Sequence, residues 1–152
     1  MRTSRRTDLW IIAIILVLDQ ATKALVRARF NLYDELALIP GFLNLTRVHN
    51  TGAAFGLLNA SDLPLKTVLL GIVAAAALIG LAVYSAMLPL EHWLTRLGLS
   101  FIIGGAAGNL IDRVRLGGVT DFVKLPHWPA FNVADACITV GVVVLVYVLE
   151  KR

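Results

Sequence analysis

Residues 67–88, TVLLGIVAAAALIGLAVYSAML, decide the fold because they contain no charged side chain. A helix needs about 20 mostly apolar residues to cross a bilayer, so this stretch predicts a membrane-spanning helix. Of the 152 residues of the chain, 58% are apolar and 16% are charged, whereas a soluble domain has about 45–50% apolar and about 25% charged residues. The mean hydropathy of +0.78 agrees with a membrane protein. This composition excludes an intrinsically disordered chain, and the lone Cys137 excludes a disulfide-stapled secreted module.

Three more apolar runs have the length of a spanning helix, at about residues 9–26, 93–111 and 133–149. The first run follows a basic start, as in a cleavable signal peptide. However, no small-x-small cleavage site follows it, and three further spans make an uncleaved helix the simpler interpretation. We therefore predict an all-α membrane protein with four transmembrane helices in a single integral-membrane domain, residues 1–152.

Two long connections, at about residues 27–66 and 112–132, carry signals of a small β-structure. Within them, residues 42–48 and 119–123 predict short strands, because each lies next to turn signals that contain glycine, asparagine or proline. With four spans, both long connections lie on one side of the membrane and both termini lie on the other. The unusual polar residues of the chain are concentrated in these connections and at the adjoining helix ends.

The formal charge of +4 does not indicate a nucleic-acid partner, because the basic residues are scattered and form no stripe interleaved with aromatic residues. Anionic lipid headgroups fit the basic chain ends better. Six of the 14 Lys and Arg residues lie on the side of the termini and seven on the other, with Lys23 inside the first span. The count therefore does not decide the orientation, although the basic N-terminus favours cytoplasmic termini.

Ionisable residues at membrane depth cost about 2.5–3.5 kcal/mol on insertion scales, and they are therefore candidate functional residues. Asp19 and Lys23 are spaced i,i+4, which predicts an ion pair that orients the first helix. Asn109, Asp112 and Arg113 share one helix face at the end of the third span. The simplest interpretation of these three is a polar helix end that holds the following connection in place.

Asp121 and Asp135 are 14 residues apart, and Pro126 and Pro129 between them allow the chain to return to the same site. Two carboxylates that meet at a water–lipid boundary do not easily both ionise, so such a pair would share one proton, as in an aspartic protease. One carboxylate would take a proton from water, and the proton of the other would go to the carbonyl oxygen or the leaving amine. Spacing alone does not establish this pair. At the start of the fourth span, Asn132 fits the helix N-cap better than Asp135.

Other hydrolase chemistries lack their motifs in the sequence. The three histidines lie on different connections, and neither a His-Glu-x-x-His zinc pair nor a Gly-x-Ser-x-Gly elbow occurs. The small residues at 104–108 predict close helix packing, and Cys137 is expected to be a small core residue.

Five ordered motifs together resemble the bacterial lipoprotein signal peptidase family, signal peptidase II. They occur in the order of that family and at the expected places relative to four spans. They cover nearly the whole chain and leave mainly the basic N-terminus and the hinge at Pro89 outside. The motifs are DQATK at residues 19–23, NTGAAF at 50–55, GAAGNLIDR at 105–113, VTDF at 119–122 and FNVAD at 131–135.

The resemblance implies an aspartic endopeptidase of the bacterial cytoplasmic membrane with four helices, cytoplasmic termini and a small extracytoplasmic β-cradle. Such enzymes remove the signal peptide from a prolipoprotein and cut before the cysteine that carries a diacylglyceryl group. The resemblance implies neither a metal nor an organic cofactor, and we expect a monomer surrounded by membrane lipid. The residues that match the family's catalytic aspartates are Asp121 and Asp135. Those that match its substrate-binding pocket are Asn50, Asn109, Arg113 and Asn132, and those with an expected structural role are Asp19, Lys23 and Asp112.

The residues alone leave two alternatives. A small four-helix proton-coupled transporter would also place Asp19, Asp112 and Asp135 in or near the membrane. It would not explain a long structured connection that carries Asn50 and Asp121. A helical adaptor that only binds partners would leave the carboxylates near the membrane without a purpose.

Overall fold

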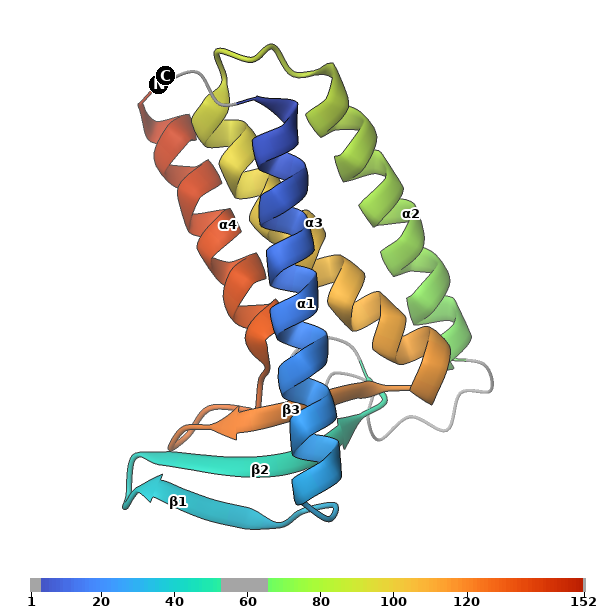
Figure 1. Cartoon of the computed structure of the whole chain (residues 1–152), viewed down its shortest axis with the longest axis vertical. Helices are drawn as coiled ribbons and strands as arrows, with labels where there is room; N and C mark the ends of the chain where they lie inside the picture. The colour runs from blue at the N-terminus through green and yellow to red at the C-terminus, as the bar shows by residue number, and fades with distance from the viewer. Residues whose placement is uncertain (1–3, 53–65, 152) are drawn as a thin grey trace.

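The computed structural model describes residues 4–52 and 66–151, in which four helices stand on a small sheet at one end (Figure 1). Each of these helices is long and apolar enough to cross a membrane. The predicted fold class, an all-α membrane protein with four transmembrane helices and a small β-structure, is confirmed. The helices are α1 (Arg5–Arg29), α2 (Lys66–Met87), α3 (Trp93–Leu116) and α4 (Val133–Glu150), and the strands are β1 (Glu35–Ile39), β2 (Leu43–Asn50) and β3 (Val119–Lys124).

Helix α3 extends beyond its predicted end at residue 111 and stops at Leu116. Arg113 and Arg115 lie in its last turn, where positive side chains interact favourably with the negative end of the helix dipole. Gly117 then ends the helix in a left-handed conformation with φ of 73°. We expected the connection to begin at residue 112, but it begins after Leu116, and Asp112 belongs to the helix.

The sheet has the strand order β1-β2-β3, and both neighbouring pairs are antiparallel. Strands β2 and β3 confirm the strands predicted at 42–48 and 119–123, with β2 extended to Asn50. The sequence did not predict β1. Its residues, ELALI, lack the alternation of apolar and polar residues that indicates a half-buried strand, and all five are exposed in the structure.

The register between β2 and β3 places two candidate site residues side by side. Val48 pairs with Asp121, and Asn50 pairs with Val119. Alternate residues of a strand project from the same face, so the side chains of Asn50 and Asp121 share one face of the sheet.

Helix α3 packs against each of the other three helices, and its glycines allow the closest approaches. A Cβ atom at Gly105 would collide with the carbonyl oxygen of Ala134 at the start of α4. A Cβ atom at Gly108 would collide with the carboxylate of Asp19 on α1. The predicted packing role of residues 104–108 is therefore confirmed, and these contacts set the positions of α1 and α4 beside the site.

A second contact joins α1 and α3 near the other end of the helices. Arg96 is completely buried, and its guanidinium forms an ion pair with Asp8. Arg5 also donates to the carbonyl oxygen of Leu88 at 3.4 Å. The sequence contained no signal for the Asp8–Arg96 pair, because the two residues are distant along the chain.

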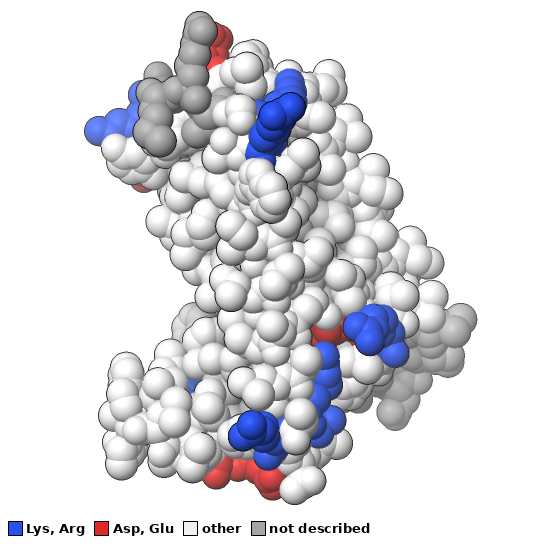
Figure 2. Space-filling model, in the orientation of Figure 1, with Lys and Arg blue, Asp and Glu red and all other residues white. Residues whose placement is uncertain are grey.

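The exterior of the helices is apolar. Figure 2 shows one face on which the charged residues lie towards the two ends, with an uncharged middle between them. None of the residues in the spanning window of α2 is buried. A soluble protein rarely exposes so large an apolar surface, whereas a bilayer covers it. In Figure 1 the start of α1 and the end of α4 lie at the end of the molecule opposite the sheet.

Candidate active site

Asn132 joins the two aspartates that the sequence singled out. Its side-chain amide donates to Oδ1 of Asp121 at 2.7 Å, and its backbone N–H donates to Oδ2 of Asp135 at 3.2 Å. Asp121 lies on β3 and Asp135 in the first turn of α4. The chain between them returns because Phe131 pairs with Val123 beside the sheet. The structure therefore brings both carboxylates to one asparagine, while their catalytic role stays a prediction.

The start of α4 holds Asp135 through a capping box. Oδ1 of Asn132 accepts from the backbone N–H of Asp135 at 3.0 Å, and the Asp135 carboxylate accepts from the backbone N–H of Asn132. The interpretation of Asn132 rather than Asp135 as the N-cap is confirmed, and Asp135 is the third residue of the helix, where it completes the capping box. Each side chain satisfies an N–H that the helix leaves without a partner, and this exchange fixes the Asp135 carboxylate.

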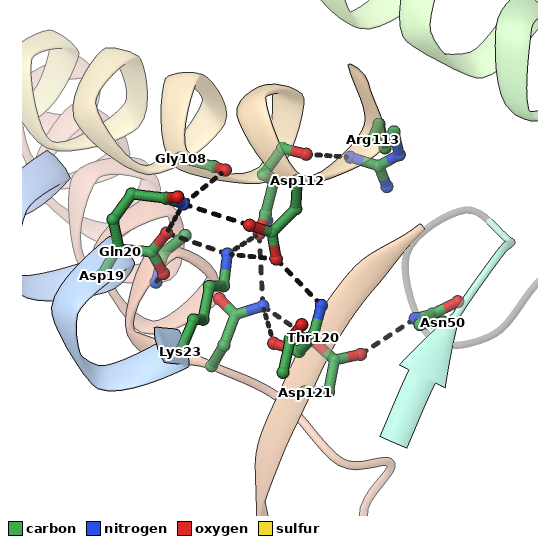
Figure 3. Close-up of polar contacts among 12 residues, drawn as sticks. Asp19, Gln20, Lys23, Asn50, Gly108, Asp112, Arg113, Thr120 and Asp121 are labelled. Carbon is green, nitrogen blue, oxygen red and sulfur yellow. Dashed lines mark hydrogen bonds and ion pairs between the residues drawn. The ribbon is translucent and has the colours of Figure 1, made fainter. Parts of the chain in front are cut away.

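Two more asparagines donate to the same carboxylates. Asn50 on β2 donates from Nδ2 to Oδ2 of Asp121 at 3.0 Å, as Figure 3 shows. Asn109 on α3 donates from Nδ2 to Oδ1 of Asp135 at 2.8 Å. Each oxygen of the two carboxylates therefore accepts a hydrogen bond from an asparagine N–H. Three of the four polar residues predicted for the pocket, Asn50, Asn109 and Asn132, contact an aspartate.

Lys23 lies beneath this site and is completely buried. Its Nζ is 2.8 Å from Oδ2 of Asp19 and 3.5 Å from Oδ2 of Asp112 (Figure 3). The ion pair predicted from the i,i+4 spacing is therefore present, with Asp112 as a second acid. Nζ also donates to Oδ1 of Asn109 at 2.9 Å, which connects the ion pair to the aspartate site.

Asp19 and Asp112 also bind backbone groups of the neighbouring elements. Oδ1 of Asp19 accepts from the N–H of Ala134 at 3.0 Å, and Oδ2 of Asp112 accepts from the N–H of Thr120 at 3.0 Å. Gln20 donates to both acids, at 3.1 and 3.2 Å. Sequence reasoning did not single out Gln20. Its signal was a polar amide beside an acid within an otherwise apolar span. These contacts fix the starts of β3 and α4 against α1 and α3.

Arg113 takes a different direction from the other residues at the end of α3. Its guanidinium donates to the carbonyl oxygen of Asn109 at 3.5 Å, and in Figure 3 its side chain extends away from Asp112. Asn109 and Asp112 therefore share the expected helix face, because both contact Lys23. Arg113 lies beside these contacts. Residues 53–55 of the predicted NTGAAF motif lie outside the described residues.

Burial raises the pKa of Asp121 from 3.8 to about 7. Hydrogen bonds from Asn50 and Asn132 act in the opposite direction, and the charge of Asp135 adds to the increase. The backbone dipoles at the start of a helix favour an anion, and Asp135 occupies such a position. Near neutral pH, the raised pKa leaves Asp121 protonated in a substantial fraction of the molecules.

Asp121 opens into a pocket of about 510 Å³ on one face of the sheet. A neighbouring pocket of about 460 Å³ shares Lys124, Trp128 and Pro129 with it. The pocket of about 510 Å³ is lined by Tyr33, Glu35, Thr46, Val48, Asn50, Asp121, Lys124, Trp128, Pro129 and Ala130.

Four membrane-length helices with two carboxylates held together at one end define an integral-membrane protein with a buried polar site beside its apolar helices. Membrane-embedded hydrolases form one such class. The profile of the family described as signal peptidase (SPase) II matches residues 11–150, and the chain belongs to this family. It is thus a peptidase and a multi-pass protein of the bacterial inner membrane, and the alternative of a proton-coupled transporter is not supported.

Curated relatives and solved structures agree with this assignment. The chain is 44% identical over 136 residues to a lipoprotein signal peptidase of Moorella thermoacetica, covering 90% of this chain and 87% of the relative. It is 40% identical over 151 residues to the lipoprotein signal peptidase of Pseudomonas aeruginosa, covering 95% and 88%. A solved structure described as a bacterial membrane enzyme superposes with a TM-score of 0.89 at 30% identity, covering 99% of this chain and 97% of that one.

Proposed function

We propose that this peptidase is an aspartic endopeptidase that removes the signal peptide from prolipoproteins and cuts before the diacylglyceryl-modified cysteine. The observation that carries the proposal is the contact of Asn132 with both Asp121 and Asp135, at 2.7 and 3.2 Å. Two carboxylates held by one asparagine can share a proton and act as acid and base on the same peptide bond. The relatives of Moorella thermoacetica and Pseudomonas aeruginosa, both lipoprotein signal peptidases, support the substrate class.

In the proposed reaction, the ionised Asp135 takes a proton from a water molecule, whose oxygen attacks the scissile carbonyl carbon. Asp121 donates its proton to the carbonyl oxygen as the tetrahedral intermediate forms. When the carbon–nitrogen bond breaks, the proton held by Asp135 goes to the leaving amine and the hydroxyl proton returns to Asp121. The raised pKa of Asp121, about 7, supports its assignment as the initial acid.

The amides of the site hold the two carboxylates without neutralising them. Asn50 and Asn132 donate to Asp121, and Asn109 donates to Asp135. A Lys or Arg side chain in place of these asparagines would favour the ionised form of both acids. We assign Asn50, Asn109 and Asn132 to the orientation of the dyad and to substrate-backbone binding, and Arg113 to substrate binding beside it.

The lipid-modified substrate enters from the side. Its signal helix lies against the apolar surfaces of the helices, its acyl chains stay in lipid, and the peptide near the cysteine enters the pocket at Asp121. The exposed apolar residues of α2 and the pocket of about 510 Å³ support this route. The scissile bond then lies at the headgroup level, where α3 ends and α4 begins.

We also propose that the chain acts as a monomeric single domain, with cytoplasmic termini and an extracytoplasmic site. Elements α1, β2, α3, β3 and α4 of one chain supply the described contacts of the site, which supports a complete site in a monomer. The basic N-terminal residues Arg5 and Arg6 support the orientation.

The test is cleavage of a diacylglyceryl prolipoprotein by the purified chain. Asp121→Asn and Asp135→Asn should each lower kcat by at least about 10³-fold, because each removes half of the proton-sharing pair. Asp34→Asn makes the same chemical change at an exposed residue away from the pair and should leave turnover unchanged. Near-normal turnover by either dyad variant would refute the proposed chemistry.

Asp112 provides a second comparison because it belongs to the network beneath the site. Asp112→Asn leaves the dyad intact but weakens contacts with Lys23 and the N–H of Thr120. A hydrogen bond to a charged group contributes about 1.5–3 kcal/mol, so this variant should unfold at a lower temperature. At temperatures well below its unfolding temperature, this variant should keep its peptidase activity.

A further inference from the structure

Each of the three asparagines at the dyad has its carbonyl oxygen occupied by a hydrogen-bond donor. Oδ1 of Asn50 accepts from the backbone N–H of Gly52 at 3.0 Å, and Oδ1 of Asn132 accepts from the backbone N–H of Asp135 at 3.0 Å. A side-chain amide has an acceptor end and a donor end. A donor on the oxygen therefore directs the NH₂ group towards the carboxylate.

Asn109 differs because a side chain supplies its donor. Oδ1 of Asn109 accepts from Nζ of Lys23 at 2.9 Å, while Nδ2 donates to Asp135 at 2.8 Å. An ammonium group can only donate, so it excludes the flipped amide, in which Nδ2 would face Nζ. The amide of Asn132 also donates to this oxygen, at 3.2 Å, but the charge-assisted bond from Lys23 is shorter and about twice as strong as a neutral one.

We propose that Lys23 is a positioning residue of the peptidase reaction, which orients the amide of Asn109 so that Asp135 always meets an N–H donor. In the flipped amide the carbonyl oxygen would face Asp135, and only a protonated carboxyl could bond to it. Lys23 thereby presents an N–H group, rather than a carbonyl oxygen, to the carboxylate that accepts the proton of water in the proposed reaction. The inference rests on the proposed function and deepens it, because the sequence predicted only an ion pair that orients the first helix.

The other charged groups around Asp135 do not make this contact. Asp19 on α1 binds the N–H of Ala134, Asp112 on α3 binds the N–H of Thr120, and Arg113 on α3 binds the backbone oxygen of Asn109. On β3, Asp121 binds the amides of Asn50 and Asn132. Within residues 4–52 and 66–151, the cation at the side-chain oxygen of Asn109 is that of Lys23.

The test is the pH profile of kcat for Lys23→Met, measured with the full chain in detergent micelles and a diacylglyceryl prolipoprotein. Without the ammonium group the flipped amide becomes possible, and it favours the protonated carboxyl, so the acidic limb should move up by about one unit. The alkaline limb should move less, because Lys23 acts on Asp121 only through its charge. KM should change little, since Lys23 does not line the pocket at Asp121.

Gln20→Leu is the matched control. Gln20 donates to Asp19, Asp112 and the carbonyl oxygen of Gly108, and none of these bonds involves Asn109. This variant should lower the unfolding temperature and leave the acidic limb in place. If it moves the limb as far as Lys23→Met does, the shift reports a loosened network and the proposal is wrong.

A second variant covers the case in which Lys23→Met does not fold. Removing one member of a buried ion pair leaves an uncompensated charge, whereas replacing both members is often close to neutral for stability. In Asp19→Asn combined with Lys23→Met, Asp112 keeps Arg27 as a cation at 3.7 Å. This double variant should therefore accumulate and show the same displaced acidic limb, and Asp19→Asn alone should not. An unchanged limb in the folded variants overturns the proposal, and so does failure of both Lys23 variants to fold. Failure of the proposed function would appear instead as turnover by Asp121→Asn or Asp135→Asn.

Discussion

At the scale of single residues, the four acids at the sheet end of the helices have two kinds of partner. Asp19 and Asp112 lie near the ammonium of Lys23, at 2.8 and 3.5 Å. Asp121 and Asp135 instead accept hydrogen bonds from neutral amides and backbone N–H groups. A cation stabilises a carboxylate as a fixed anion, whereas an amide leaves more freedom to gain and lose a proton. The two kinds of partner separate structural acids from the acids that we propose for catalysis.

The raised pKa of Asp121 leads to a prediction about stability. The group has a pKa of about 7 in the folded protein and an ordinary value of 3.8, so the folded state binds the proton more tightly. The resulting stabilisation is complete below about pH 4 and is lost as the pH rises through about 7. Asp121→Asn lacks this titration. Its unfolding temperature relative to wild type should therefore rise between pH 4.5 and pH 8.

Thermal unfolding in detergent at several pH values measures this difference. One pKa unit corresponds to about 1.4 kcal/mol, so the change should amount to a few kcal/mol at most. Asp34→Asn changes an exposed acid and should run nearly parallel to wild type. If Asp121→Asn also ran parallel to wild type, Asp121 would not hold its proton up to neutral pH.

At the scale of the elements, α3 sets the geometry of the site. It contacts the other three helices, and it carries Asn109 and Asp112 on the side where α1 and α4 approach. The absence of a side chain at Gly105 and Gly108 allows the start of α4 and the acid of α1 to come close. Packing and polar contacts therefore depend on the same part of this helix.

Gly105→Ala should disturb the site through packing alone. Its Cβ atom would collide with the backbone oxygen of Ala134, so α4 has to shift together with Asn132 and Asp135. Overpacking of this kind costs about 1–3 kcal/mol. We expect a lower unfolding temperature and at least a tenfold loss of kcat, measured on the same purified sample.

Gly80→Ala is the control for this substitution. A Cβ atom at Gly80 on α2 would meet no atom within 4 Å, and alanine favours the helix. This variant should be as stable and as active as wild type. Equal behaviour of the two alanine variants would mean that the approach of α3 and α4 does not determine the site.

At the scale of the whole molecule, the sheet and the aspartate site lie at one end of the helices, and the start of α1, the end of α4 and the connection between α2 and α3 lie at the other (Figure 1). If all four helices span the membrane, the proposed reaction site lies on the side opposite to the termini. For a peptidase that processes exported proteins, this side should be outside the cytoplasm.

Single cysteines test this orientation in a Cys137→Ala background. Asn31 and Arg115 are exposed at the sheet end, and Glu91 is exposed at the other end. A membrane-impermeant thiol reagent on intact cells should label cysteines at positions 31 and 115 but not at 91. Labelling at 91 with protection at 31 and 115 would place Asp121 in the cytoplasm and contradict the proposed orientation.

The sequence by itself determined the four spans, the two longer strands and the ion pair of Asp19 and Lys23. These features depend on local properties, namely the length of apolar runs, turn residues and i,i+4 spacing. The family motifs also singled out the residues that meet at the site. Strand β1 was not predicted because its residues, ELALI, show no alternation of apolar and polar side chains.

Only the tertiary structure decided which groups touch. Asn132 donates to Asp121 and Asp135 together, and Lys23 reaches Asn109 across 86 residues of sequence. Nor did the sequence place Asp135 within the capping box or extend α3 to Leu116. Hydrogen bonds between distant elements depend on how closely the helices approach and on the register of the sheet. Neither quantity is encoded in the spacing of residues along one chain segment, because both result from the packing of α1, α3 and α4 around small side chains.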